Sequence, residues 1–318
     1  GVKYVSVRDN LLVDVGSIAG GGNFSSFYRR WLRMVDDRIL PEFRVDKVPS
    51  LDEPGFEEAC RRVGAEPPKF WSVRGCLERL EGFDFGSYAR FRDFPGVDGS
   101  SRLSPAIRLG VVSIREVYRV SKGSPEFVRQ LAWREYYYFL KEKFPWMKDL
   151  ELKYWMRGIE WENDPSLVKA FMEGRTGYPI VDAGVRQLKT EKWVHNRVRL
   201  ILASFLAKDL LVDWRVGERF FREHLIDYDQ VLNVGNWQWA SSVGVDPLYL
   251  RVFNPISQSR RYDPDCRYVR KYLPELEGLS CEAVHDPLKW RIEGYCEPVV
   301  DHYQRVKRFK ELASRRKR

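Results

Sequence analysis

The sequence has no long uncharged apolar run. The apolar stretch at its centre, residues 200–207, lies between Arg199 and Lys208. It is far too short to cross a bilayer as a helix, which takes about 20 residues. No secretory signal is visible either, because Gly1 opens directly into ordinary globular sequence. We therefore expect a chain that acts in the cytoplasm and has no membrane partner.

Cysteine is scarce and widely spaced. The five cysteines contain no C-x-x-C pair, and their odd number favours reduced thiols in a cytosolic protein over a disulfide framework. They are Cys60, Cys76, Cys266, Cys281 and Cys296. Because the tight ligand spacing of zinc and iron–sulfur sites is missing as well, we expect no metal in this protein.

The sequence also lacks a run of alternating strands and an internal repeat. From about residue 56 onward, apolar residues recur at helical steps almost throughout, which predicts an all-α fold. Turns are expected at residues 93–99, 121–125 and 174–179 and at Gly235. Residues 24–34 predict an amphipathic helix, and residues 303–312 a basic helix followed by a frayed tail. Residues 3–7 alternate like a strand, and residues 41–54, with proline at both ends, predict a linker.

Basic and aromatic residues, by contrast, are plentiful. Lysine and arginine outnumber the acids by 54 to 45, which gives a net charge of +9, and 14% of the residues are aromatic, including 11 tryptophans. An anionic partner fits this charge, although an unspecialised basic surface explains it equally well. The aromatic residues could stack on a planar ligand or on bases, relay electrons, or simply fill a large helical core.

Residues 193–239 combine a buried helical stripe with polar residues that folding alone does not require. The stripe comprises Val194, Val198, Ile201 and Phe205. The polar residues are Asn196, Arg197, Arg199, Asp227, Asp229 and Asn233. Buried charge is costly unless it is paired, so we expect Arg199 to meet one of the two aspartates around a polar ligand. A purely structural ion pair is the alternative. Up to Gly235 this stretch predicts two helices, and then a turn followed by two tryptophans.

Two further motifs place polar groups beside apolar helices. Residues 99–105, GSSRLSP, could present backbone N–H groups and serine hydroxyls to a phosphate, or could form an ordinary cap with Ser104 at the helix start. On the next helix, Gln130, Trp133, Arg134 and Tyr137 share one face. That face suits stacking on a planar group and hydrogen bonding to another, although an aromatic core stripe is the alternative.

From about residue 88 to residue 276 the sequence closely resembles the FAD-binding helical domain of DNA photolyases and cryptochromes, and the chain is identified as a member of that family. The resemblance rests on several motifs in order. They are RDFPGVDGSSRLSP, FVRQLAWREYY, GRTGYPIVDAGVRQL, WVHNRVRL, DLLVDWRVGERFF, IDYDQVLNVGNWQWASSVG and RVFNPISQSRRYDPD.

The resemblance implies FAD as the cofactor. The positions that match FAD-binding residues are Tyr88, Ser100, Ser101, Leu103, Ser104, Arg134, Arg199, Asp227, Asp229 and Asn233. Among these, Arg199 and Asp227 match a buried pair beside the isoalloxazine ring, and Asp229 matches an acid near the adenine. Asn233 matches the side chain facing flavin N5, where asparagine is expected to favour fully reduced FADH⁻. Protein groups near the ring nitrogens set the electronics of a bound flavin.

The resemblance also implies UV-damaged DNA as a partner. Trp133 and Trp239 match two indoles that flank a flipped-out pyrimidine dimer, and Asn196 matches a residue that hydrogen-bonds the lesion. The DNA-binding arginines that match phosphate clamps are Arg92 and Arg197. The tryptophans that match an electron-transfer chain to the flavin are Trp237, Trp214 and Trp161. Three unrelated core indoles are the alternative.

Three positions depart from the pattern of enzymes that split cyclobutane dimers. Gln130 replaces a catalytic glutamate that donates to the dimer, Leu200 replaces methionine, and Ser100 replaces threonine. Glutamine at the first position is found in the (6-4)-photoproduct branch and in cryptochromes. Against that branch, Asn196 and Leu200 stand where it usually carries histidines. Cyclobutane-dimer repair therefore stays the first expectation.

The front of the chain differs from the family as well. Its members normally begin with an α/β domain that can hold an antenna chromophore, and here the resemblance begins near the last strand of that domain. We expect residues 1–55 to form a linker and remnant of it, 56–300 the catalytic FAD-binding domain, and 301–318 a basic helix and tail. The chain would be a fragment, half of a split enzyme or a short natural homologue. It would carry no antenna cofactor, and would be a monomer unless a separate α/β domain or subunit binds it.

We therefore expect an enzyme, a carbon–carbon lyase that repairs DNA in light. Excited FADH⁻ would pass an electron to the dimer, the cyclobutane ring would split, and the electron would return. Three alternatives stay open. The first is a cryptochrome-like blue-light photoreceptor that binds FAD without repair, and the second is (6-4)-photoproduct repair. The third is a basic helical nucleic-acid module without flavin.

Overall fold

The structure is a computed structural model of the 318-residue chain, and it describes residues 10–20, 22–37, 39, 73–246, 248 and 250–317. Every regular element in these ranges is a helix and none is a strand, which confirms the predicted all-α fold. The strand expected at residues 3–7 and the linker expected at 41–54 lie outside the described residues. The chain divides into two compact units. The domain boundaries expected at residues 55 and 300 stay predictions.

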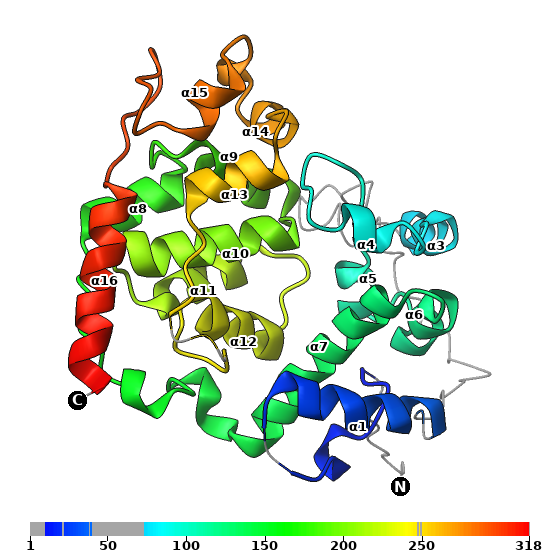
Figure 1. The fold of residues 1–318 in the computed structure, drawn as a ribbon. Helices are drawn as coiled ribbons and strands as arrows, with labels where there is room; N and C mark the ends of the chain where they lie inside the picture. The colour runs from blue at the N-terminus through cyan, green and yellow to red at the C-terminus, as the bar shows by residue number, and fades with distance from the viewer. Residues whose placement is uncertain are drawn as a thin grey trace, which may run out of the picture. The chain divides into compact units, whose positions relative to one another are not determined.

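The first unit takes in residues up to 86 and residues 101–139. Its elements are η1 (Val15–Ser17), α1 (Phe24–Asp37), α3 (Val73–Gly82), α5 (Ser104–Arg108), α6 (Ile114–Ser121) and most of α7 (Pro125–Lys143). Figure 1 labels the α-helices among them. The helix predicted from residue 24 is confirmed. It packs on α7 through aromatic rings, because the ring of Phe27 lies 5.2 Å from Tyr136 and 5.1 Å from Phe139.

A buried carboxylate, Glu135 of α7, ties three segments of this unit together. It accepts hydrogen bonds from the backbone N–H groups of Leu12 and Val13 and, at 2.7 Å, from the indole of Trp31. Burial raises the pKa of Glu135 to about 7, although these hydrogen bonds act in the opposite direction. The segment that precedes α1 is therefore fixed to α7 by one side chain.

The second unit takes in residues 87–100 and 140–318. In chain order it contains α4 (Tyr88–Phe91), η3 (Pro145–Lys148), η4 (Tyr154–Met156), α8 (Pro165–Glu173), α9 (Pro179–Glu191), α10 (Asn196–Ser204), η5 (Phe205–Asp209), α11 (Trp214–His224), α12 (Gln230–Ala240), α13 (Pro255–Tyr262), α14 (Arg267–Tyr272), η6 (Pro274–Leu276), α15 (Cys281–His285) and α16 (His302–Lys317). The stripe of Val194, Val198, Ile201 and Phe205 is buried, as predicted.

The core of this unit runs through α10 and the π-helix η5. All residues from 201 to 212 are buried, and a helix buried on every side lies at the centre of its unit. Helices α9 and α12 pack against α10, and α16 packs against η5. This central helix carries Arg199 near its start, so the polar residues of the sequence motif begin at the edge of the core.

Local sequence sets the ends of several of these helices. Asp164 caps α8 by accepting a hydrogen bond from the Ser166 N–H at 2.8 Å, and Gly174 ends it with a left-handed backbone, φ +67°. Pro179 then opens α9. The predicted turns at residues 93–99, 121–125 and 174–179 are thus confirmed.

Three predictions about helix ends are wrong. Gly235 lies inside α12 and makes no turn, since its neighbours Val234 and Trp237 are buried and their packing outweighs the poor helix propensity of one glycine. Residues 193–235 form more than two helices. They contain α10 with its continuation η5, then α11, and then the start of α12 at Gln230. The basic tail is not frayed, because α16 runs on to Lys317.

Across the described ranges, no helix has the length and apolar character that crossing a membrane requires.

Candidate functional site

Arg199 and Asp227 form the ion pair that the sequence predicts. Nη2 of Arg199 donates to both carboxylate oxygens, at 2.8 and 3.0 Å, and Nε donates to the carbonyl of Val194 at 2.8 Å. The Asp227 side chain is 4% exposed and that of Arg199 is 25% exposed. Within the described part of the chain, Nη1 of Arg199 has no hydrogen-bond partner. One donor of a fixed guanidinium is therefore available to a ligand.

Asn233, on α12, is buried and oriented by its own hydrogen bonds. Its amide nitrogen donates to Glu218, to the backbone carbonyl at 3.1 Å and to Oε1 at 3.2 Å. The hydroxyl of Tyr228 donates to the same Oε1 at 2.9 Å. This pattern assigns the orientation of the amide. With the nitrogen occupied, the carbonyl oxygen of Asn233 is the atom that could accept a hydrogen bond from a ligand.

Asp229 has a structural task as well as the predicted one. It is buried, and its Oδ1 accepts a hydrogen bond from the Leu232 N–H at 3.1 Å, which caps α12. We call Arg199, Asp227, Asp229 and Asn233 together the Arg199 cluster. All four lie in the second unit, on or beside α10 and α12, which pack against each other.

The three tryptophans of the expected electron-transfer chain lie in the second unit at graded depth. Trp237 and Trp214 are 2% and 0% exposed, and Trp161 is half-buried. The backbone N–H groups of Glu162 and Asn163 both donate to the carbonyl of Leu211. The segment that carries Trp161 therefore runs beside the segment that leads into α11, which begins at Trp214.

The two buried indoles have different surroundings. Trp214 Nε1 donates to Oε1 of Glu151 at 3.2 Å, and the guanidinium of Arg215 lies 4.7 Å from its ring. Trp237 Nε1 is buried, and among the described residues it has no hydrogen-bond partner. Gly217 of α11 makes room for this indole, because a Cβ there would lie 2.1 Å from Trp237. The close fit of α11 and α12 holds Trp237 in place, although an unpaired buried N–H is costly.

The residues expected to contact DNA in this unit are less buried. Asn196 is the first residue of α10 and is exposed, and Trp239 of α12 is half-buried. The Trp239 ring lies 5.7 Å from that of Phe253 and 5.0 Å from the guanidinium of Arg251. Both Asn196 and Trp239 therefore retain surface that a partner could contact.

The two arginines expected to clamp phosphates converge on one carboxylate, Asp93. Arg197 donates from Nη2 to Asp93 Oδ1 at 2.8 Å, and Nε of Arg92 lies 3.9 Å from the same oxygen. The guanidinium of Arg197 also lies 4.2 Å from the ring of Tyr262, and the side chain is 14% exposed. Their roles toward DNA stay predictions, and Arg197 would have to leave or share Asp93 to reach a phosphate.

In the first unit, the predicted face of α7 is confirmed as a helical face of mixed character. Gln130, Trp133 and Arg134 are half-buried and Tyr137 is buried. Phe24 covers one face of Trp133, with ring centroids 3.7 Å apart and planes 6° apart. Arg134 donates to the carbonyl of Asn10 at 2.5 Å. A base could stack only on the other face of Trp133.

The amide of Gln130 is already engaged within α7. Its Nε2 donates to Oε1 of Glu126 at 3.1 Å, one helical turn earlier. This hydrogen bond assigns the amide nitrogen of Gln130 to the side of Glu126, so its carbonyl oxygen points away from Glu126. Gln130 therefore stands where a glutamate was expected, and its amide is hydrogen-bonded to Glu126, four residues earlier.

The hydroxyl loop is divided between the two units. Tyr88 and Ser100 belong to the second unit, and Ser101, Leu103 and Ser104 to the first. Ser101 Oγ accepts a hydrogen bond from the Leu103 N–H at 3.4 Å. The alternative that Ser104 caps the helix is wrong, because Leu103 takes the cap position and no side chain caps it.

Sequence reasoning missed two sets of buried charges. Glu218 looks like a solvated residue of the amphipathic α11, yet it holds Asn233. Lys208, Asp209 and His302 are all buried where η5 meets α16, and His302 hydrogen-bonds Asp209. Burial lowers the pKa of Lys208 to about 7 and raises that of Asp209 to about 6. The charged pair Lys208-Asp209 inside an apolar run was the signal for the second set.

Comparisons with known proteins identify the family of the chain. Residues 127–315, more than half of the chain, match the family model of the FAD binding domain of DNA photolyase. The chain is 42% identical over 265 residues to a deoxyribodipyrimidine photo-lyase of Alkalihalophilus pseudofirmus, a match that covers 75% of this chain and 55% of that protein. It is 40% identical to one of Escherichia coli, with 92% of this chain and 69% of the relative covered. The chain thus spans between about half and two thirds of the length of these relatives.

A solved structure of a photolyase has the same fold as this chain. The crystal structure of the archaeal photolyase from Sulfolobus tokodaii, which holds two FAD molecules, has a TM-score of 0.87 and 35% identity to this chain. The match covers 97% of this chain and 71% of that one. Family model, relatives and fold therefore agree, and the chain belongs to the DNA photolyase family through its FAD-binding helical domain, whose cofactor is FAD.

Proposed function

We propose that this chain repairs cyclobutane pyrimidine dimers in DNA in a light-driven reaction. The observation that carries the proposal is the Arg199 cluster, where a buried carboxylate fixes a guanidinium and leaves Nη1 without a partner in the described structure. Asn233 adds an acceptor oxygen whose direction is fixed by Glu218. A fixed donor on a partly buried arginine and a fixed acceptor on a buried asparagine fit a polar ring system with both N–H and acceptor atoms.

The residues of the cluster fit FAD, which when bound would supply the light-absorbing electron donor. Arg199 would hold a positive charge beside the ring, and Asp227 would keep that charge in one position. Asn233 would accept a hydrogen bond through its carbonyl oxygen. The hydroxyls and backbone of the loop that contains Ser100, Ser101 and Ser104 would bind phosphate oxygens, with Tyr88, Leu103, Arg134 and Asp229 as further contacts.

Two indoles support a DNA substrate. Trp239 is half-buried on α12, and Trp133 keeps one face that Phe24 does not cover. Stacking of a base on an aromatic side chain contributes about 1–3 kcal/mol, which offsets part of the cost of turning a lesion out of the duplex. Asn196, exposed at the start of α10, would hydrogen-bond the lesion, and Arg92 and Arg197 would contact the flanking phosphates. The net charge of +9 favours such a partner.

The three tryptophans support a second task, recovery of the reduced state. Trp161 is half-buried whereas Trp214 and Trp237 are buried, so the three lead from the surface into the interior of the second unit. An indole can give up and regain one electron without moving. We infer that an electron from solvent reductants enters at Trp161 and passes inward through Trp214 to Trp237.

The proposal is tested with the chain reconstituted with FAD, reduced, and mixed with an oligonucleotide that contains one thymine dimer. Specific binding over an undamaged oligonucleotide of the same sequence is expected, together with loss of the dimer under blue light. Replacing Trp239 by alanine is expected to weaken lesion binding by on the order of tenfold or more, which corresponds to about 1.4 kcal/mol or more of lost stacking. Equal affinity for damaged and undamaged DNA would contradict a lesion site.

A blue-light photoreceptor without repair activity is the second candidate. It is favoured by one observation, that Gln130 offers no acidic proton and donates its amide hydrogen to Glu126. In that case the FAD-loaded chain would photoreduce through its tryptophans but would leave the dimer intact. Photoreduction and dimer loss measured on one sample therefore separate the two functions.

A further inference from the structure

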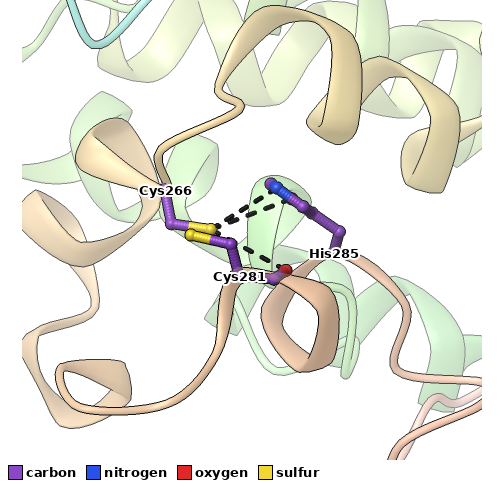
Figure 2. A group of neighbouring side chains, drawn as sticks. All are labelled: Cys266, Cys281 and His285. Carbon is purple, nitrogen blue, oxygen red and sulfur yellow. Dashed lines mark hydrogen bonds between the residues drawn. The ribbon is translucent and has the colours of Figure 1, made fainter.

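Two cysteines and a histidine come together in the second unit, far from the Arg199 cluster in sequence. Cys266, Cys281 and His285 each offer one ligand atom, and these three atoms lie within 4.8 Å of one another. Figure 2 shows both sulfurs pointing toward each other and the imidazole pointing at them. Sγ of Cys266 lies 3.5 Å from Nε2 of His285. Both cysteines are free thiols.

Helix geometry brings the group together although its members are spread along the chain. Cys281 and His285 are the first and last residues of α15, four positions apart, so they share one face of that helix. Cys266 is the residue directly before α14 and lies fifteen positions before Cys281 in the sequence. Because the two cysteines are so far apart in the chain, their spacing alone gave no reason to expect a metal site.

The backbone at Cys266 is unusual. Its φ is +55°, the left-handed region that glycine or asparagine normally occupies. Residues held in this region are enriched at functional and ligand sites, because the surrounding structure must enforce the conformation. Here the conformation turns the Cys266 side chain toward α15.

The histidine is oriented by a neighbour on a third helix. Nδ1 of His285 lies 2.7 Å from the hydroxyl of Ser259, a buried residue of α13. Metal-binding histidines usually use their second ring nitrogen in this way, and the contact fixes the orientation of the ring. Nε2 is the nitrogen that faces Cys266. It also lies 3.3 Å from the carbonyl of Pro264, a contact that a bound zinc ion would replace.

We propose that Cys266, Cys281 and His285 bind a zinc ion. In a tetrahedral site with zinc–sulfur and zinc–nitrogen bonds of about 2.3 and 2.0 Å, a sulfur and a nitrogen are about 3.5 Å apart. The observed 3.5 Å between Cys266 and His285 agrees with this value. Binding would release the two thiol protons to solvent, and the resulting centre of Zn²⁺, two thiolates and a neutral imidazole carries no net charge. A neutral centre is compatible with the burial of Cys266 and His285.

The ion would link the start of α14 directly to α15. Its ligands lie at the start of α14 and on both ends of α15, and its supporting serine lies on α13. The fourth position would be taken by water, because Cys281 is half-buried and the site is not closed on its side. This site is independent of the proposed repair function.

Metal analysis of the 318-residue chain tests the proposal. Protein loaded with Zn²⁺ and then dialysed against metal-free buffer is expected to keep about one zinc per chain. Replacing zinc by Co²⁺ is expected to give the strong visible bands of tetrahedral cobalt and a thiolate-to-cobalt charge-transfer band, recorded with the flavin oxidised. Ser259→Ala, which removes only the support of His285, is expected to weaken zinc binding by about 10–100-fold.

Cys281→Ser and His285→Gln are expected to abolish retention of the metal, and Cys296→Ser is the matched control. Cys296 is also a half-buried thiol of the second unit, but it lies outside the group. Added zinc should raise the melting temperature of the wild type and of Cys296→Ser, and not that of Cys281→Ser, whatever the stability of each variant. Zinc retention by Cys281→Ser equal to the control would overturn the proposal. So would a Cys266–Cys281 disulfide in protein purified without chelator.

Discussion

Arg199 gives two hydrogen bonds from a single guanidinium nitrogen to Asp227, while the neighbouring nitrogen, Nη1, has no partner among the residues that the structure describes. Arginine and carboxylate commonly pair through two nitrogens, so this arrangement leaves a directed donor unused. Asp227 thus fixes the position of Arg199 without consuming all of its hydrogen-bonding capacity. We interpret this asymmetry as the mark of a binding site, in contrast to a purely structural pair.

Removing the charge of Asp227 is expected to lower both stability and flavin binding. In Asp227→Asn, the guanidinium of Arg199 loses its counter-charge while it is still three-quarters buried. The free energy of unfolding should fall by about 1–3 kcal/mol, and FAD should dissociate more readily. Chemical denaturation and equilibrium dialysis measure the two effects. Glu275→Gln is the matched control, since it breaks the exposed pair with Arg186 and should cost less than about 1 kcal/mol. Similar losses in both variants would contradict a special role for Asp227.

A pairing of Arg199 with Asp227 or Asp229 could be predicted from sequence, because buried charges need partners and both aspartates follow Arg199 in the same motif-rich stretch. Which aspartate pairs, and which atoms do so, depends on how α10 and the segment before α12 meet in three dimensions. Glu218 was missed for the same reason. It lies on a helix whose pattern is that of an ordinary amphipathic surface helix, and only the packing of α11 on α12 places it beside Asn233.

Trp237→Phe is expected to block light-driven reduction of the flavin and to leave repair by chemically reduced protein largely intact. Phenylalanine fills most of the buried space but is much harder to oxidise than an indole. The absorbance change under blue light and the loss of dimers measure the two activities separately. Trp290→Phe is the control, because Trp290 is 42% exposed and lies outside the predicted chain. Loss of both activities in Trp237→Phe would mean that the residue serves repair itself.

Glu135 is expected to make stability depend on pH. Its pKa rises from the ordinary value of 4.5 to about 7 in the folded protein, so folding favours the protonated carboxyl. The contribution of Glu135 to stability is therefore complete below about pH 4.5 and is lost as the pH rises to about 7, a change on the order of 3 kcal/mol. Urea unfolding across this range should show a weaker pH dependence for Glu135→Gln than for the wild type. The exposed Glu223 provides the control, and Glu223→Gln should keep the wild-type slope.

Gln130→Glu is expected to increase the yield of dimer splitting. The new carboxyl would lie close to Glu126, whose oxygen is now 3.1 Å from the Gln130 amide. Two carboxyl groups so near each other share a proton, which supplies an acidic donor. A charge-assisted hydrogen bond to the lesion in place of a neutral one should raise the yield on the order of fivefold, or about 1 kcal/mol. Glu126→Gln in the wild-type background controls for changes at the neighbouring residue. A lower yield in Gln130→Glu would indicate that this site is not built for cyclobutane dimers.

The group of Cys266, Cys281 and His285 could not be predicted from the sequence. Cys266 and Cys281 have no metal-site spacing, and their closeness depends on the turn between α14 and α15 and on the left-handed backbone at Cys266. Gly235 shows the opposite error. A local preference for turns was expected to end a helix, but the packing of the surrounding side chains carried α12 through it.

The most direct test of the central claim is repair itself. The FAD-loaded, reduced chain is mixed with a thymine-dimer oligonucleotide, and the remaining dimer is quantified after equal times in blue light and in darkness. The proposed function predicts more than one dimer split per protein molecule in light and none in darkness. A lesion that stays intact in light while the protein holds reduced flavin and binds the damaged DNA would contradict it.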